Sequence, residues 1–446
     1  MPEREGFAMM SWATRFRFWK YLKECLWLMP TLGLVLGALL AQWAVVVDGT
    51  GVLPSKWTYA ESTASSVLSS IVGAMIALVG FVVTIGVLVV QQATGALSPR
   101  YMRLWYRDYL QKAVLATFTA TFAFAFFLLT SIGSETVPDL GVTLAGLGVA
   151  VSLVLLLVYL NRFAHSLRPV ATAAIVGRMG QRLIAELTAA GRNATAFDSR
   201  TLPSSPATPV SAARAGAIQA IDVDGLIALA VRHECTIVLA HPVGDFLPPG
   251  ATLARIHGGT TLTDPRHVRG KVALGVERTI EQDPAFALRV LVDIATRALS
   301  PAVNDPTTAI QVLDHIEAFL HTLDTATLRR RHVVSDERGR PLLVVPDRSW
   351  EDYLQLAVSE IRDFGVTSVQ VCRRIRALLD GLLETVQAGN RAAVTTELHR
   401  LDAAVERTFG DPDQRAFAMM GDRQGIGTGT WEDEAQAGQS PPQDGP

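Results

Sequence analysis

The feature that most constrains this chain is an apolar stretch from Ala64 to Val90. It contains no charged residue, no proline and no asparagine. A helix of this length, at 1.5 Å per residue, exceeds the roughly 30 Å hydrocarbon core of a bilayer. The stretch therefore predicts a transmembrane helix.

Small and hydroxyl-bearing residues recur along this stretch at steps of four and three residues. They are Ser66, Ser70, Gly73, Ala77, Gly80 and Thr84. The spacing places them on one face of a helix, and larger apolar residues cover the other faces. Such a small-residue face either packs against another helix or, in a symmetric oligomer, lines a neutral pore. Both interpretations remain open at the level of sequence.

Three further apolar stretches have the length of membrane spans. Together the four spans form a transmembrane domain over residues 26–162, at about 26–47, 64–90, 113–132 and 140–160. No carboxylate, lysine or arginine lies within them, which argues against a proton relay, a voltage sensor or a strongly charge-selective filter. A conducting protein of this kind would work as an oligomer, because four spans are few for a self-contained transporter.

Basic residues predict how the spans are oriented. They concentrate before the first span, between the second and third, and after the fourth. The positive-inside rule then places both termini in the cytoplasm. Residues 1–25 combine Trp12, Phe16 and Trp19 with several cations, a pattern typical of an interfacial segment in the headgroup region.

The remainder of the chain resembles a cytoplasmic α+β region. We expect a helix and flexible linker at 163–216, a small β-barrel-like module at 217–275, and a helical bundle at 276–410. The last residues, 411–446, are rich in Gly, Gln, Asp and Pro, so we expect them to be disordered.

Composition and motifs exclude several functions. The three cysteines have no CxxC spacing, the nine histidines no metal-ligand spacing, and no nucleotide-binding or catalytic motif occurs. We therefore predict no metal and no cofactor, and an enzyme is not favoured. No basic block suggests nucleic acid. The expected partners are the lipid bilayer, further copies of the chain, and a small ion or cytoplasmic ligand.

A turn before a helix is the strongest candidate for a ligand site in the soluble part. The residues concerned are Arg297, Ser300, Asn304, Asp305, Thr307 and Thr308. Asp305 suits the N-cap position and Pro306 the first helical position, which favours a structural role. The alternative is that the helix N-terminus binds an anion, although the Asp305 carboxylate would repel one.

Two motifs resemble the bacterial membrane-protein family called domain of unknown function 2254. The first lies before the third span and comprises Ser98, Pro99, Arg100, Asp108 and Gln111. The second is ALSPAVNDPTTA, from Ala298 to Ala309, in which Thr307 stands where an aromatic residue is expected. The resemblance covers residues from about 20 to 410 and implies a four-span bacterial inner-membrane protein, but no particular activity.

Two functional hypotheses follow. The leading one is an oligomeric channel or passive transport protein with a cytoplasmic regulatory domain. The alternative is a non-transporting sensor or scaffold whose cytoplasmic domain binds a ligand or a partner protein.

Overall fold

The chain forms two compact units, Trp19–Arg168 on the one hand and Met1–Phe18 with Pro169–Pro446 on the other. The computed structural model describes residues 10–48, 59–96, 108–133, 137–166, 168–190, 194–196, 207–259, 264–326 and 331–425. We call the two units the membrane unit and the soluble unit.

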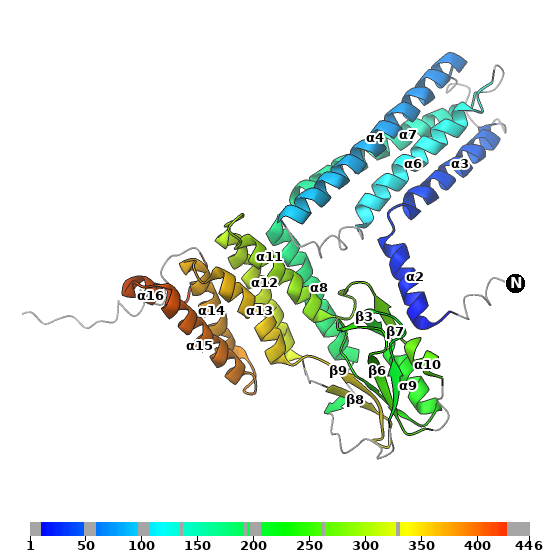
Figure 1. The fold of residues 1–446 in the computed structure, drawn as a ribbon. Helices are drawn as coiled ribbons and strands as arrows, with labels where there is room; N and C mark the ends of the chain where they lie inside the picture. The colour runs from blue at the N-terminus through cyan, green and yellow to red at the C-terminus, as the bar shows by residue number, and fades with distance from the viewer. Residues whose placement is uncertain are drawn as a thin grey trace, which may run out of the picture. The chain divides into compact units, whose positions relative to one another are not determined.

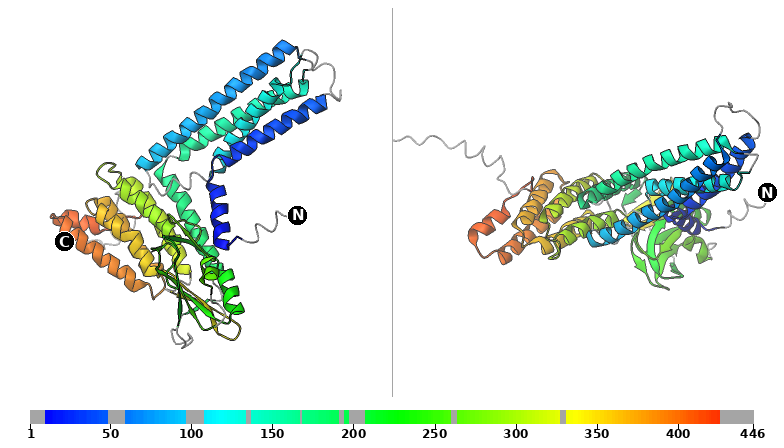
Figure 2. Two further views of the ribbon diagram at one scale, coloured as in Figure 1. Left: turned by 45° about the vertical axis from the view of Figure 1, so that its right-hand side comes forward. Right: turned by 90° about the horizontal axis from the view of Figure 1, so that it is seen from above.

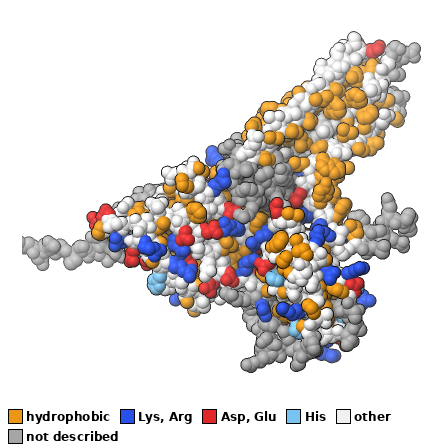
Figure 3. All heavy atoms as spheres, in the orientation of Figure 1, with side chains coloured by type: hydrophobic (Ala, Val, Ile, Leu, Met, Phe, Trp, Pro, Cys, Tyr) orange, Lys and Arg blue, Asp and Glu red, His pale blue; other side chains and the backbone are white. Residues whose placement is uncertain are grey.

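The membrane unit contains four long apolar helices. They are α3 (Leu28–Asp48), α4 (Glu61–Ala96), α6 (Tyr109–Leu129) and α7 (Asp139–Ser166), which run side by side in Figures 1 and 2. Each contains a window long and apolar enough to cross a bilayer, so the prediction of four spans is confirmed. Their surface in Figure 3 is largely hydrophobic, whereas charged side chains gather over the rest of the chain.

Helix α6 is the centre of the membrane unit. Half of the residues in its most apolar segment are buried within the chain, compared with 22% in the corresponding segment of α3 and 28% in those of α4 and α7. Its buried residues include Val114, Phe118 and Leu128. The other three helices therefore pack around α6 and expose most of their own surface.

Helix α3 approaches α6 closely through glycines. A Cβ atom on Gly33 would lie 2.3 Å from the carbonyl oxygen of Ala116, and one on Gly37 would lie 2.2 Å from that of Ala120. The hydroxyl of Thr119 also donates a hydrogen bond of 2.9 Å to the Pro30 carbonyl. This is small-residue packing of the kind that stabilises helix pairs in membranes.

Helix α2 (Trp12–Glu24) differs from the expected interfacial segment at its first turns. The rings of Trp12 and Phe16 stack at 5.3 Å and pack on a soluble-unit cluster that includes Ala273. These two aromatic side chains are thus partly covered by protein. Trp19, further along the helix, remains 55% exposed.

Two sheets form one part of the soluble unit. The six-stranded sheet has the order β1-β8-β9-β4-β6-β2, and the three-stranded sheet has the order β5-β3-β7. The strands are β1 (Ala194–Ala196), β2 (Thr208–Ser211), β3 (Gly216–Ile221), β4 (Thr236–Leu239), β5 (Phe246–Leu247), β6 (Thr252–His257), β7 (Val272–Gly275), β8 (Arg331–Ser335) and β9 (Pro341–Pro346). All pairs are antiparallel except β4 with β9.

These sheets correct the expectation of a small barrel at 217–275. No barrel closes among the described strands, because β8 and β9, from beyond residue 330, join the larger sheet beside β4. The two sheets share one apolar core, to which Ile218 and Ile256 contribute from opposite sheets. Helices α9 (Val223–Arg232) and α10 (Pro265–Arg269) cover this core through Leu226 and Val268.

The other part of the soluble unit is helical. It comprises α8 (Pro169–Ala190), α11 (Pro284–Ala298), α12 (Pro306–Thr325), α13 (Trp350–Gly365), α14 (Val369–Thr385), α15 (Arg391–Thr408) and α16 (Pro412–Met419). Helices α11 to α15 lie within residues 276–410, where a helical bundle was predicted, and strands β8 and β9 lie in the same range. Helix α8 packs against α11 and α12, as the views in Figures 1 and 2 agree.

Two segments contain more structure than their composition suggested. Strands β1 and β2 lie inside the stretch 163–216, for which a helix and a flexible linker were expected. Helix α16 lies inside the stretch 411–446 that was expected to be disordered, and Phe417 of this helix packs its ring 4.1 Å from the guanidinium of buried Arg373. Tertiary contacts of this kind override a low local propensity.

Candidate functional site

The small-residue face of α4 points away from the other helices of the same chain. All six of its residues, from Ser66 to Thr84, are exposed in the single chain. The opposite face, with Leu68, Met75 and Val82, is fully buried against neighbouring helices. Among the described helices of the membrane unit, the small residues therefore do not serve packing.

Space is open around the two glycines of this face. A Cβ atom on Gly73 or on Gly80 would meet no atom within 4 Å. The hydroxyls of Ser70 and Thr84 donate to the carbonyls of the residues four positions earlier in α4, so their hydrogen bonds stay inside the helix. The face is consequently smooth, uncharged and free to meet another molecule.

The motif before the third span lies only partly within the described residues. Ser98, Pro99 and Arg100 fall outside them. Asp108 caps α6 by accepting a hydrogen bond of 2.9 Å from the Leu110 amide. Its other oxygen lies 3.4 Å from Nε of Arg162 at the end of α7. Asp108 thus stabilises the start of α6 and links it to α7.

Gln111, the last residue of this motif, is buried within the membrane unit. It is 4% exposed, and its Oε1 atom has no hydrogen-bond partner among the described residues. A buried amide oxygen of this kind lowers stability unless water or another group satisfies it. The same first turn of α6 carries Lys112, whose Nζ donates to the carbonyl of Lys23.

The turn from Ser300 to Thr308 is organised by Asp305. Its carboxylate accepts a hydrogen bond of 3.0 Å from the Thr308 amide and a second, of 2.5 Å, from the Thr308 hydroxyl. Asn304 has a φ of 49°, in the left-handed region. The Ser300 hydroxyl donates to the Arg297 carbonyl at 2.7 Å.

These contacts match the capping interpretation of the turn. The side chains of Ser300, Asp305 and Thr308 are engaged inside the turn, whereas Asn304 and Thr307 are exposed. The Arg297 side chain is exposed as well. A carboxylate already occupies the helix N-terminus, where an anion would bind. Ligand binding at this turn stays a prediction.

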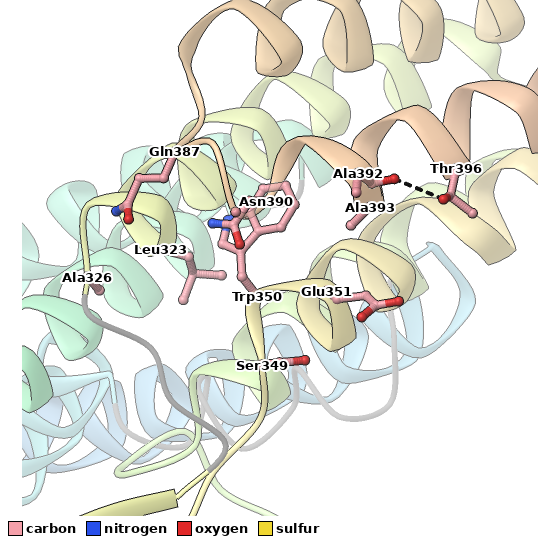
Figure 4. A pocket seen from close by; sticks show the side chains of 11 residues that line it. Leu323, Ala326, Ser349, Trp350, Glu351, Gln387, Asn390, Ala392, Ala393 and Thr396 are labelled. Atoms are coloured by element: carbon pink, nitrogen blue, oxygen red, sulfur yellow. Dashed lines mark hydrogen bonds between the residues drawn. The ribbon is translucent and has the colours of Figure 1, made fainter. Parts of the chain in front are cut away.

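A pocket of about 440 Å³ lies elsewhere in the helical part, between the end of α12 and the starts of α13 and α15 (Figure 4). It is lined by Leu323, Ala326, Ser349, Trp350, Glu351, Gln387, Gly389, Asn390, Ala392, Ala393 and Thr396. Its size is within the range of small-molecule sites. None of these residues belongs to a predicted site, and no spacing in the sequence links its three segments.

Buried polar groups border this pocket. Asp324 is 7% exposed, and its carboxylate accepts from the Gln387 amide at 3.1 Å and from Nδ2 of Asn390 at 2.7 Å. Asn390 therefore does not cap α15 with its side chain. Trp350 is 4% exposed, and its indole N–H has no acceptor among the described residues.

Metal and thiolate chemistry would depend on the possible metal ligands and on the two cysteines of the soluble unit. No group of three His, Cys, Asp or Glu side chains in the described ranges is placed to hold a metal ion. Burial raises the pKa of the Cys372 thiol to about 11, and it also raises the pKa of Cys235. Both thiols therefore stay protonated at neutral pH, so neither is an activated nucleophile.

Four long apolar helices followed by a mixed helix-and-sheet unit define the class of this protein, a multi-span membrane protein with a large soluble part. The chain belongs to the family described as "Predicted membrane protein (DUF2254)", which matches residues 23–381. The resemblance inferred from the two motifs is thereby confirmed.

Mycobacterial proteins are similar over most of their length. The chain is 31% identical over 421 residues to "Uncharacterized protein Rv1290c" of Mycobacterium tuberculosis and to "Uncharacterized protein Mb1321c" of Mycobacterium bovis. The match covers 90% of this chain and 80% of each relative. No solved structure matches the chain.

Proposed function

We propose that copies of this protein associate in the membrane through the small-residue face of α4. The observation that supports this is the exposure of all six residues of the face, on the side of α4 that faces away from its own chain. Small residues let helix backbones approach closely, and this packing drives association in lipid, where burial of apolar surface gives little.

The function that we infer for such an oligomer is passive conduction. Gly73 and Gly80, toward one edge of the face, would lie against the neighbouring copy. Ser66, Ser70 and Thr84, toward the other edge, would present rings of hydroxyl groups to a narrow neutral path around the symmetry axis. The absence of charged residues from the predicted spans supports a passive path rather than a proton-coupled pump. The soluble unit would then regulate conduction.

Substitution of Gly80 by leucine tests this proposal. Because the site is open in the single chain, Gly80→Leu leaves the chain's own packing intact but obstructs a second copy. We expect a smaller oligomeric fraction in lipid nanodiscs and a reduced ion flux in liposomes. The matched control is Gly146→Leu on α7, where an added Cβ also meets no atom within 4 Å.

The two variants separate the possible outcomes. A variant Gly80→Leu that assembles and conducts like the wild type would contradict the role of this face. Loss of assembly in both variants would show a general effect of leucine in the membrane unit. A stable oligomer with no flux under any ion gradient would rule out conduction and leave association alone.

The pocket bordered by Trp350 and Asn390 supports a second function, that of a membrane sensor or scaffold. In that case the soluble unit would bind a small polar ligand without transport. Binding of a metabolite that is weakened by Asn390→Ala, in a protein that shows no flux, would favour the sensor over the channel.

We further propose that both termini are cytoplasmic and that the membrane is the bacterial inner membrane. The basic residues flanking the spans support this orientation. Buried, unpaired cysteines in the soluble unit agree with a reducing compartment.

A further inference from the structure

One end of the helical part of the soluble unit carries exposed apolar side chains. We call this end the apolar tip, and it consists of Pro301, Ala302, Val303 and Phe364. Val303 is 47% exposed and Phe364 is 57% exposed. The two belong to neighbouring segments, because a Cβ on Gly365 would lie 3.1 Å from Cδ1 of Leu299.

Some polar groups beside the tip are engaged within the protein, whereas Asn304 and Thr307 are exposed there. The Asp305 carboxylate accepts from Thr308, and the Ser300 hydroxyl donates to a backbone carbonyl. The carboxylate of Asp363, beside Phe364, lies 3.0 Å from Nε of Arg362. Exposed apolar groups gathered at one place mark a surface that meets another apolar phase.

Contacts along α8 show where the tip lies relative to the start of that helix. A Cβ on Gly177 would lie 3.5 Å from Cβ of His315, and one on Gly180 would contact the ring of Phe319. Helices α8 and α12 therefore run in the same direction. At 1.5 Å per residue, Pro169 lies about 12 Å before Gly177, and α12 likewise begins about 13 Å before His315.

Helix α11 runs antiparallel to α8, and its C-terminal end lies at the height of the first residue of α8. A Cβ on Gly180 would lie 3.1 Å from Cβ of Ala287. Pro169 lies about 16 Å before Gly180, and Ala298 lies about 16 Å beyond Ala287. Measured along the α8 axis, the turn between α11 and α12 thus lies at the same height as Pro169 or slightly beyond it, on the side away from Gly180.

Chain connectivity holds the first residue of α8 near the bilayer. The fourth apolar window ends at Phe163, helix α7 ends at Ser166, and α8 begins at Pro169. Three peptide units span at most about 10 Å, so Pro169 cannot lie far from the end of the last span. The headgroup layer begins at the edge of the hydrocarbon core.

We propose that the apolar tip inserts into the headgroup region of the bilayer that holds the four spans. Val303 and Phe364 would reach the boundary of the acyl chains, where aromatic and aliphatic side chains are stabilised. Arg297, which is exposed at this end of the soluble unit, favours anionic headgroups. This inference does not depend on whether the protein conducts ions.

Site-specific fluorescence of the full-length protein tests the proposal. Variants Val303→Cys and Phe364→Cys are labelled with an environment-sensitive dye and reconstituted into phosphatidylcholine and phosphatidylglycerol liposomes. The native cysteines are at most 7% exposed, so an unsubstituted chain serves as the labelling blank. The control is Leu187→Cys, at a residue 40% exposed, about 27 Å along α8 from Pro169.

Two quenchers distinguish the environments of the dye. With the tip in the bilayer, nitroxide lipids quench the dye at Val303 and Phe364 while aqueous iodide does not, and the dye at Leu187 behaves in the opposite way. Iodide quenching at the tip would overturn the proposal. So would protection from both quenchers, which indicates cover by protein, or equal lipid quenching at all three positions.

Discussion

At the scale of single residues, side chains that cap helices define the turns of the soluble unit. Asp305 is the clearest case, because its carboxylate accepts both hydrogen bonds that Thr308 donates. Asp283 caps α11 in the same way while Arg278 donates to its other oxygen. Burial nevertheless raises the pKa of Asp283, against the opposing effect of that arginine.

His315 makes the soluble unit sensitive to acid. Burial against α8 lowers the pKa of this side chain below its ordinary value, Asp314 opposes the shift, and Arg178 adds to it. The folded state therefore binds fewer protons than the unfolded state as the pH falls below about 6.5, so stability is lost on acidification.

The variant His315→Gln should remove this part of the pH dependence. We expect the change in unfolding free energy between pH 7.5 and 5.5 to shrink by less than about 1 kcal/mol, since solvent screens the half-buried ring. Thermal unfolding of the purified protein at both pH values measures it. An unchanged pH dependence in His315→Gln, relative to the exposed control His399→Gln, would argue against the assignment.

At the scale of elements, glycine serves two different purposes in the membrane unit. On α3, Gly33 and Gly37 lie directly against α6, and a side chain has no room there. On α4, Gly73 and Gly80 face open space. The spacing Gly33-x-x-x-Gly37 is by itself a sequence signal for close helix packing.

The variant Gly37→Leu should weaken the packing of α3 on α6. Its Cβ would lie 2.2 Å from the Ala120 carbonyl oxygen, so the two helices must separate. Overpacking of this kind costs about 1–3 kcal/mol or more. We expect a lower midpoint of thermal unfolding in detergent, whereas the open-site control Gly146→Leu should leave it unchanged. Equal midpoints in the two variants would contradict this packing.

At the scale of the whole molecule, a predominantly apolar set of spans is combined with a charged soluble part (Figure 3). The soluble unit carries dense ion pairs, such as Arg289 with Glu360 and Arg374 with Glu317, which join different helices. A unit stabilised in this way is suited to water, which agrees with the proposed cytoplasmic location.

Fusion of a fluorescent protein to the C-terminus tests that location. A green fluorescent protein exported across the inner membrane in an unfolded state does not become fluorescent, so we expect bright cells if the C-terminus is cytoplasmic. A fusion to alkaline phosphatase, which needs the oxidising periplasm for its disulfides, should be inactive. The reverse pair of results would overturn the orientation.

The sequence by itself determined the four apolar spans and indicated a mixed helix-and-sheet region after them. Long apolar runs and capping residues such as Asp305 and Ser349 act locally, so their effect can be read from neighbouring residues. The tertiary structure decided which segments that are distant in the sequence contact one another. Strand β9 pairs with β4 and prevents a small barrel, and the pocket joins three separate segments.

The small-residue face of α4 shows most clearly the difference between what the local sequence determines and what tertiary packing determines. Helical spacing predicts that Ser66 to Thr84 share a face, because the periodicity of an α-helix is a local property. Which face of α4 meets α6 depends on how large side chains such as Leu68 and Met75 fill the space between helices, a property of the packed unit. Only the structure therefore decided that the small residues are exposed in the single chain.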